Sequence, residues 1–388
     1  MTTTMKNQAL QRAGRLLALS FILPFGLMPG AAGAETPNRP MVGVKIYEYA
    51  ESFPKLFEEW RSLGINTAFV GAALGADPEF KALAKKNGIT TFLIFPVFFD
   101  AAALEKDPGL YAVKSGGQRA EDDWVKFICP TREDYRSRKI EEAKRLVREV
   151  DPDVLSLDFM RFFVFWEKVY PDRTPDSLPD TCFDTSCLEA FEKEMNVHLP
   201  ADLSGAETAA KAKWVLANHA PEWADWKCRT IAGMVKLLAA AAREVKPSIK
   251  INIHTVPWRK ADFRGGIETI AGQDVVRLAP LVDYISPMCY HQMVRRTPAW
   301  VHSVAQEVYD RTHGRVLPSI QVDKAYIEDP YTLAQFKEAV TEALKPPSLG
   351  VVFWSWDALN KAPDRKEALK AVLGGPGRGC PRPSYKVR

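Results

Sequence analysis

Strand-like and helix-like segments alternate along this chain, and no other feature restricts its possible folds as strongly. Runs rich in β-branched and aromatic residues predict eight strands, at 42–49, 66–71 and 90–98, within 151–163, and at 249–256, 282–290, 315–322 and 349–356. Amphipathic patterns predict helices at 52–63, 77–88, 131–150, 226–245, 275–281, 298–311, 332–344 and 363–373. Strands that alternate with helices in this way predict a parallel sheet covered by helices.

Eight such units over about 330 residues predict an α/β fold, a (β/α)₈ TIM barrel. An open, doubly wound sheet is the alternative, but it usually brings a glycine-rich turn after the first strand. The segment YEYAESF, at 47–53, contains no glycine. The glycine-rich GGPGRG at 374–379 follows no strand and begins no helix, so we assign the barrel to 35–375 and a C-terminal tail to 376–388.

A long insertion follows the fourth strand, at about 164–225. It contains two cysteines that lie close together, Cys182 and Cys187, and it ends in the Trp-rich stretch HAPEWADWKC. We expect this insertion to form a subdomain over the mouth of the barrel.

The first residues have the pattern of a secretory signal peptide. Basic residues come first, the short apolar run LLALSFILPFGLM at 16–28 follows, and small residues stand at Ala32 and Ala34. We expect cleavage near Ala34, removal of 1–34, and export to the periplasm or the medium. Because no second apolar run reaches spanning length, we expect no stable membrane insertion after cleavage.

Charge and cysteine content narrow the possible partners. The net charge of +4 is spread along the chain without a basic block, which gives no support for nucleic-acid binding. Export permits disulfides, and a local Cys182–Cys187 bridge is possible, although six cysteines allow about 15 full pairings. No C-x-x-C occurs and the six histidines are scattered, so we predict neither a metal nor a cofactor. The sequence does not indicate an oligomeric state.

Polar and aromatic residues gather where the predicted strands end. Barrel enzymes place their catalytic groups at these C-terminal ends. The candidates are Glu48, Asp158, Arg161, His254, Trp258, Tyr290, His291, Asp323, Trp354, Trp356 and Asp357. Aromatic faces stack on sugar rings, and cleavage of a glycosidic bond needs two carboxyl groups. The set therefore predicts a carbohydrate substrate.

Asp158 is the first choice for a catalytic carboxylate because it ends the fourth strand. The alternative is a structural Asp158–Arg161 pair; in the site, Arg161 would hold Asp158 ionised or bind a sugar hydroxyl. Asp323 and Glu48 are the candidates for the second carboxyl group, although Asp323 would also serve as a cap. Glu48 lies between two tyrosines, where apolar surroundings would keep it protonated.

The remaining candidates are assigned to substrate binding, each with a structural alternative. Asp357 would alternatively be the N-cap of a short helical turn, as in SWDAL. His254 and His291 would bind hydroxyls or carry protons, or be hydrogen-bonded structural residues. Trp354 and Trp356 share one face of a strand, and we expect at least one of them, with Trp258 and Tyr290, to face the substrate.

Four segments resemble the glycoside-hydrolase-like TIM-barrel family of exported bacterial proteins. The segments are CPTREDYRSRKIEEAKRLVREVDPDVLSLDFMRFF, WADWKCRTIAGMVKLLAAAAREVKPSIKINIHTVPW, VDYISPMCYH and GVVFWSWDAL. Asp158 and Arg161 match the end of the family's fourth strand. The resemblance implies a barrel that acts on polysaccharides or glycoconjugates. The chitinase motif DxxDxDxE is absent, because Met160 stands where its next acid would be, which disfavours substrate-assisted hydrolysis.

These observations predict an exported glycoside hydrolase that uses two carboxyl groups. Two alternatives remain open. One is a carbohydrate-binding barrel without catalytic activity. The other, which we favour less, is a metal-dependent barrel hydrolase that uses His254, His291 and Asp323.

Overall fold

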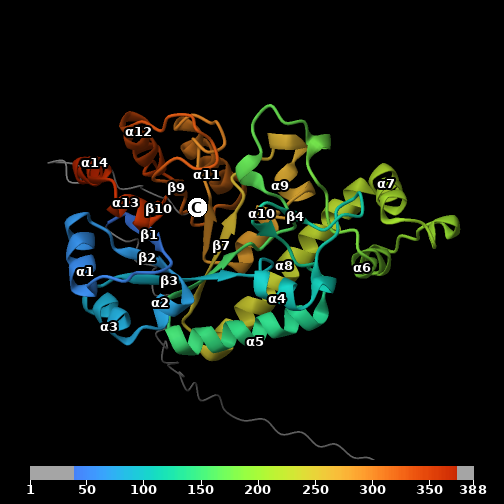
Figure 1. Ribbon diagram of the computed structural model, residues 1–388, viewed down its shortest axis with the longest axis horizontal. Helices are drawn as coiled ribbons and strands as arrows, with labels where there is room; N and C mark the ends of the chain where they lie inside the picture. The colour runs from blue at the N-terminus through green and yellow to red at the C-terminus, as the bar shows by residue number, and fades with distance from the viewer. Residues whose placement is uncertain (1–38, 374–388) are drawn as a thin grey trace, which may run out of the picture. The chain divides into compact units, whose positions relative to one another are not determined.

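The computed structural model describes residues 39–373 of the 388 residues. The predicted signal peptide and the predicted tail lie outside the described residues. Within the described part, the chain forms one barrel of parallel strands surrounded by helices (Figure 1). No described helix is long and apolar enough to cross a membrane.

Eight parallel strands form the barrel, as the sequence predicts. They are β1 (Met41–Ile46), β2 (Thr67–Val70), β3 (Thr90–Pro96), β6 (Val154–Asp158), β7 (Lys250–Thr255), β8 (Tyr284–Pro287), β9 (Ser319–Gln321) and β10 (Gly350–Trp354). Their order in the sheet is β8-β7-β6-β3-β2-β1-β10-β9. A parallel bridge connects Ile285 of β8 to Val316, which precedes β9, and another connects Met288, the residue after β8, to Ser319 of β9, so the barrel closes.

Helices follow the strands and cover the outside of the barrel (Figure 1). The longer ones are α1 (Phe53–Ser62), α3 (Pro78–Lys86), α5 (Glu133–Val150), α8 (Ala220–Val245), α11 (Ala299–Thr312), α12 (Leu333–Ala343) and α14 (Pro363–Leu373). Their ends follow local rules. Asp77 caps α3 by accepting hydrogen bonds from the N–H groups of Glu79 and Phe80, a cap worth about 1 kcal/mol. Thr332 and Gln335 form a capping box at the start of α12.

The predicted helix 275–281 begins as α10 (Val275–Leu278). Several other elements were not predicted. Short helices lie at α2 (Ala72–Ala76), α4 (Ala101–Lys106), α9 (Gly266–Thr269) and α13 (Trp356–Asn360). An antiparallel hairpin of β4 (Glu121–Asp122) and β5 (Val125–Lys126) rises from the loop after β3. The predicted insertion folds into α6 (Thr185–Met195) and α7 (Thr208–Asn218) and the start of α8.

The insertion packs mainly against the outside of the barrel. α6 and α7 contact α8, and in Figure 1 they lie to the right of the strands. Phe183 stacks on Trp223 of α8 with ring centroids 4.6 Å apart, which anchors this contact. We expected a subdomain over the mouth of the barrel, but α6 and α7 lie beside it; at the mouth, Phe165 of the insertion packs on Trp124 and Tyr326, and Glu167 lines the cavity.

Side-chain alternation along β6 explains how a polar group reaches the interior. Leu155 and Leu157 belong to the core between the barrel and its helices, and each fully buried leucine contributes about 1.5–3 kcal/mol. Val154 joins a second apolar cluster with residues from β2, β3 and β8. Successive side chains of a strand point to opposite faces, so Ser156 and Asp158 point the same way as Val154, into the barrel.

Candidate active site

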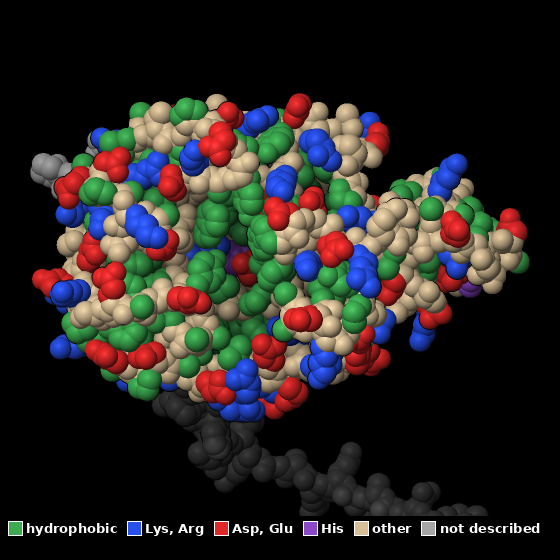
Figure 2. Space-filling model, viewed as in Figure 1, with side chains coloured by type: hydrophobic (Ala, Val, Ile, Leu, Met, Phe, Trp, Pro, Cys, Tyr) green, Lys and Arg blue, Asp and Glu red, His purple; other side chains and the backbone are tan. Residues whose placement is uncertain are grey.

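A cavity of about 290 Å³ lies at the C-terminal ends of the barrel strands. It is lined by Lys45, Tyr47, Trp124, Asp158, Phe159, Arg161, Glu167, Met288, Tyr290, Met293, Tyr326 and Trp354. Figure 2 shows a hollow near the middle of the face in view, surrounded by hydrophobic side chains, with acidic, basic and histidine groups deeper inside. The cavity combines charged and aromatic groups at the end of the barrel where the sequence places the site.

Asp158 is the last residue of β6, and its carboxylate is 8% exposed. The next residue, Phe159, has φ of 49°, a left-handed conformation that turns the chain away from the strand. The N–H of Phe159 donates to Asp158 Oδ1 at 2.8 Å. Burial opposes ionisation of Asp158, but the charges of Lys45 and Arg161 and this hydrogen bond favour it, and the pKa of Asp158 lies below its ordinary value. Asp158 is therefore a carboxylate at neutral pH.

Glu167 is the second carboxyl group of the cavity, and the sequence did not identify it. It lies in the turn Trp166–Lys168, and its Oε2 has no hydrogen-bond partner in the part of the chain that the structure describes. Burial raises its pKa to about 7, against the opposing effect of Arg161, and the charge of Asp158 raises it further. Two carboxyl groups of one cavity thus have pKa values shifted in opposite directions, which is the usual arrangement of an acid and a nucleophile or base.

Two cations share the cavity with these carboxyl groups. The guanidinium of Arg161 lies over the rings of Phe127 and Phe159, at 4.7 and 5.2 Å from their centroids. Its Nε and Nη1 have no hydrogen-bond partner among residues 39–373. Arg161 and Asp158 interact electrostatically, but no direct ion pair forms between these two described residues. The structural pair considered as an alternative is therefore absent, and Arg161 has donors free for a ligand.

Lys45 extends from β1 into the same cavity. Its ammonium donates to the hydroxyl of Tyr290 at 3.2 Å. Burial lowers the pKa of Lys45 to about 8, although Asp158 and Glu167 favour its charged form. Lys45 is thus still mostly charged at neutral pH, and it contributes to keeping Asp158 ionised.

Aromatic side chains form the walls and the rim of the cavity. Tyr290 and Trp354 stack with centroids 4.9 Å apart and planes inclined by 18°. At the rim, the indole N–H of Trp124 donates to the hydroxyl of Tyr326 at 2.9 Å. Tyr47, Trp124 and Tyr326 are 45%, 41% and 40% exposed, unusually high for such side chains. Exposed aromatic groups around a polar cavity indicate a ligand with apolar faces, as in a sugar ring.

His254 lies in a polar network inside the barrel rather than in the lining of the cavity. Its Nε2 lies 3.0 Å from Ser156 Oγ, which also accepts a hydrogen bond from Asn252 at 2.8 Å. Ser286 donates to Asn252 at 2.8 Å. Burial and Lys45 lower the pKa of His254 to about 3, so the ring is neutral. It is a structural group that supports the strand bearing Asp158.

The other predicted carboxyl groups do not line this cavity. Glu48 is exposed, because β1 ends at Ile46 and the inward positions fall on Lys45 and Tyr47. The apolar surroundings expected for Glu48 are therefore absent. Asp323 is 67% exposed, lies 3.5 Å from Arg365 and accepts a hydrogen bond from the N–H of Lys324. Asp357, 77% exposed, lies in the first turn of α13 and pairs with Lys361.

Three further candidates are buried away from the cavity. Trp258 packs on Phe263 with centroids 5.0 Å apart. His291 lies 5.3 Å from the ring of Tyr331, and burial lowers its pKa to about 4. Trp356 does not share a face with Trp354, because β10 ends at Trp354 and Trp356 begins α13. It packs against Trp60 of α1, 5.8 Å away.

The predicted metal-dependent arrangement is also absent. Within residues 39–373, the group of His, Cys, Asp and Glu side chains that is close enough to hold a metal ion contains none of His254, His291 and Asp323. It lies elsewhere and is described below.

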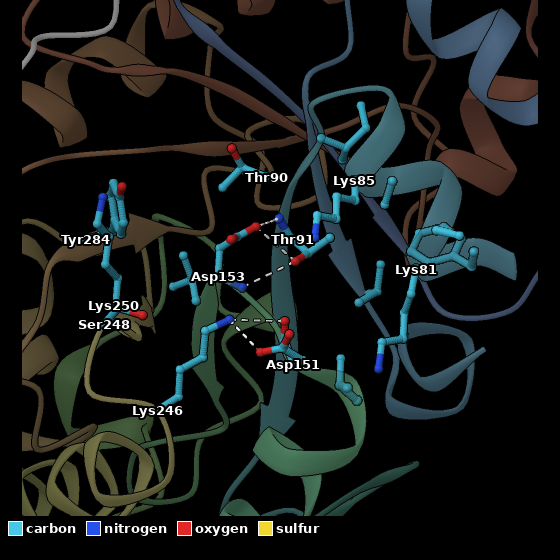
Figure 3. A pocket seen from close by; sticks show the side chains of 18 residues that line it. Lys81, Lys85, Thr90, Thr91, Asp151, Asp153, Lys246, Ser248, Lys250 and Tyr284 are labelled. Carbon is cyan, nitrogen blue, oxygen red and sulfur yellow. Dashed lines mark hydrogen bonds and ion pairs between the residues drawn. The ribbon is translucent and has the colours of Figure 1, made fainter. Parts of the chain in front are cut away.

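A larger hollow, of about 750 Å³, lies at the opposite end of the barrel (Figure 3). Several of its polar groups pair with one another. The N–H and hydroxyl of Thr91 donate to Asp153 at 2.8 and 3.1 Å, and Lys246 forms an ion pair with Asp151 at 2.7 Å. Because barrel enzymes act at the C-terminal face, this hollow at the N-terminal face fits a structural role.

Comparison with known proteins supports the fold assignment. No protein-family profile and no curated protein matches the sequence. Among solved structures, the chain is similar to the PgaB (BpsB) glycoside hydrolase domain from Bordetella bronchiseptica, at 13% identity and a TM-score of 0.64, over 86% of this chain and 99% of that one. It is also similar to Gan42B, a GH42 β-galactosidase from G. stearothermophilus, at 15% identity and a TM-score of 0.58, over 87% of this chain.

A β-galactosidase from Rahnella sp. R3 matches at 12% identity and a TM-score of 0.59, over 88% of this chain. The chain spans 57% of the length of each of these two β-galactosidases. At such identities the likeness shows the fold. The fold that the resemblance implies is confirmed: the chain forms a TIM barrel, as these glycoside hydrolase structures do.

Proposed function

We propose that this protein is an exported glycoside hydrolase that cleaves a polysaccharide or glycoconjugate with Asp158 and Glu167. The observation that carries the proposal is the pair of carboxyl groups in one cavity. Asp158 has a pKa below its ordinary value and Glu167 a pKa of about 7. Glycosidic cleavage requires an ionised and a protonated carboxyl group at the same time. The barrels to which the chain is similar include glycoside hydrolases, which supports this chemistry.

In this mechanism Glu167 is the acid. Near neutral pH it carries a proton that it donates to the oxygen of the leaving sugar. Asp158 then stabilises the positive charge that develops on the sugar ring, as a nucleophile or as the base that activates water. The separation of the two carboxyl groups around the bound sugar decides between these two roles, and thereby between retention and inversion.

The other groups of the cavity orient the sugar. Lys45 and Arg161 keep Asp158 ionised, and the free donors of Arg161 bind sugar hydroxyls. The stacked pair of Tyr290 and Trp354 offers a flat apolar wall, and Trp124 with Tyr326 extends the aromatic surface toward solvent. A cavity of about 290 Å³ with an exposed aromatic rim fits one sugar unit inside and further units outside.

The proposal is tested by hydrolysis of a panel of bacterial and plant polysaccharides, with release of reducing ends as the signal. Asp158→Asn and Glu167→Gln keep the shape of each side chain and should each lower kcat by about 10²-fold or more. Glu48→Gln, on an exposed acid outside the cavity, is the matched control and should leave kcat unchanged. Retained binding of a polysaccharide with no product from the wild type would favour the binding-barrel alternative.

Export is a separate part of the proposal, since residues 1–34 lie outside the described part. N-terminal sequencing of the protein isolated from the periplasm or medium should give a chain that begins near Glu35. Full-length protein retained in the cytoplasm would contradict export without affecting the catalytic proposal.

A further inference from the structure

Three cysteines and one aspartate meet beside the active site, in a cluster with no part in the proposed hydrolysis. Cys129 lies between β5 and α5, whereas Cys182, Asp184 and Cys187 lie around the start of α6. One ligand atom of each of these four residues lies within 4.8 Å of all the others. The three thiols are buried and unpaired, so the Cys182–Cys187 bridge considered from the sequence is not formed.

The arrangement fits a metal ion better than a disulfide. Cys129 Sγ and Cys187 Sγ lie 3.3 Å apart. A covalent bond requires about 2.05 Å, whereas two sulfurs on one tetrahedral zinc ion lie about 3.7 Å apart, given a Zn–S distance of about 2.3 Å. A disulfide would also use only two of the three thiols. It would leave the third thiol and the Asp184 carboxylate side by side, with no group that binds both.

Hydrogen-bond donors around the cluster are placed to stabilise thiolate and carboxylate ligands. The hydroxyl of Thr131 lies 3.2 Å from the sulfurs of both Cys129 and Cys187. The N–H of Val113 donates to Cys182 Sγ at 3.3 Å, and the N–H of Cys187 donates to Asp184 Oδ1 at 2.7 Å. Hydrogen bonds of this kind orient the ligands of metal sites.

We propose that Cys129, Cys182, Asp184 and Cys187 bind one zinc ion in a closed, tetrahedral structural site. Binding displaces the protons of the three thiols, so that three thiolates and one carboxylate hold the ion. The ligands come from two distant segments, and no C-x-x-C pair marks them, which is why the sequence predicted no metal.

The zinc ion would fix two loops that build the active site. Cys129 follows the hairpin that carries Trp124. Phe127, two residues before Cys129, packs on the guanidinium of Arg161, whose central carbon lies 4.7 Å from the ring centroid. The other three ligands belong to the insertion whose first turn carries Glu167. The ion therefore ties the aromatic rim to the segment that bears the acid. This role is independent of whether the cavity hydrolyses glycosides.

The test is elemental analysis of the full chain purified without chelators, together with its intact mass. We expect about one zinc ion per chain and no mass deficit from oxidised thiols. Cys182→Ser should lose the zinc, whereas Cys228→Ser, a buried thiol of α8 outside the cluster, should retain it. Absence of zinc from protein supplied with the ion, with a mass lower by the two hydrogens of a disulfide, would overturn the proposal.

Two further measurements keep the test decisive if Cys182→Ser fails to fold. Replacement of zinc by Co²⁺ in the wild type should give the intense absorption of tetrahedral cobalt with thiolate ligands. Asp184→Cys should keep the metal and strengthen the sulfur-to-cobalt band, because it supplies a fourth thiolate at the same position. A weak spectrum typical of octahedral cobalt, unchanged in Asp184→Cys, would place the ion elsewhere and overturn the site.

Discussion

Replacement of Glu167 by Gln should stabilise the protein at alkaline pH while it removes the catalytic acid. The pKa of Glu167 is raised from an ordinary value of 4.5 to about 7, with burial as the main cause. Between these two values the folded chain holds a proton that the unfolded chain has released. The free energy of unfolding therefore falls as the pH rises through this range, and the loss is complete above about pH 7.

The size of the effect follows from the pKa. One pKa unit corresponds to about 1.4 kcal/mol, so a rise from 4.5 to about 7 destabilises the wild type by about 3 kcal/mol at alkaline pH. Gln has nearly the same shape and no proton to lose. The free energy of unfolding of Glu167→Gln, relative to the wild type, should thus increase by about 3 kcal/mol between about pH 4 and about pH 8.

Urea unfolding of both proteins at the two pH values measures this difference. Glu48→Gln is the matched control, because Glu48 is exposed and lies outside the cavity. A Glu167→Gln effect of the same size at both pH values would refute the reasoning, since it would mean that Glu167 titrates in the folded protein as it does in the unfolded chain.

Three further outcomes are expected from the same cavity. The pH dependence of kcat/KM should be bell-shaped, with an alkaline limb near pH 7 set by Glu167 and an acid limb below the ordinary pKa of Asp158; a flat alkaline limb would contradict the assignment. Lys45→Met should move the acid limb to higher pH, because it removes a charge that lowers the pKa of Asp158. Trp124→Ala and Tyr326→Ala should raise KM for long glycans by about 10-fold and leave short aryl glycosides unaffected, as measured by steady-state kinetics.

The barrel was predictable because each strand lies within a segment rich in apolar residues and most of the longer helices have an apolar face. Asp158 was predictable for the same reason: it ends the run VLSLD, and alternation from Val154 places it inside the barrel. The local periodicity of a single strand thus fixes Asp158, whereas Arg161 follows in the turn after that strand.

The second carboxyl group was missed because loop geometry decides its position. Glu167 lies in a turn beyond β6, where no periodicity applies, although a lone acid among Phe165, Trp166 and Val169 is a signal that was available. Glu48 was chosen instead because β1 was expected to continue to Tyr49. The strand ends at Ile46, and this difference replaces Glu48 with Lys45 and Tyr47 in the cavity.

An error in the predicted length of a strand also explains why Trp354 and Trp356 were expected on one face. Trp354 and Trp356 would share a face only if β10 continued past Trp354, but a helix begins at Trp356 and turns its ring toward Trp60. The rim residues Trp124 and Tyr326 come from two loops that meet only in the folded barrel. The sequence alone does not show which loops meet.

The dependence of Glu167→Gln on the leaving group tests the central claim most directly. An acid is needed to cleave a glycoside whose leaving group is a sugar, but not one whose leaving group is a stable phenolate. We predict that Glu167→Gln loses about 10²-fold or more in kcat/KM on a natural glycan and nearly retains wild-type activity on a dinitrophenyl glycoside of the same sugar. An equal loss on both substrates, or none on the glycan, would contradict the assignment of Glu167 as the acid.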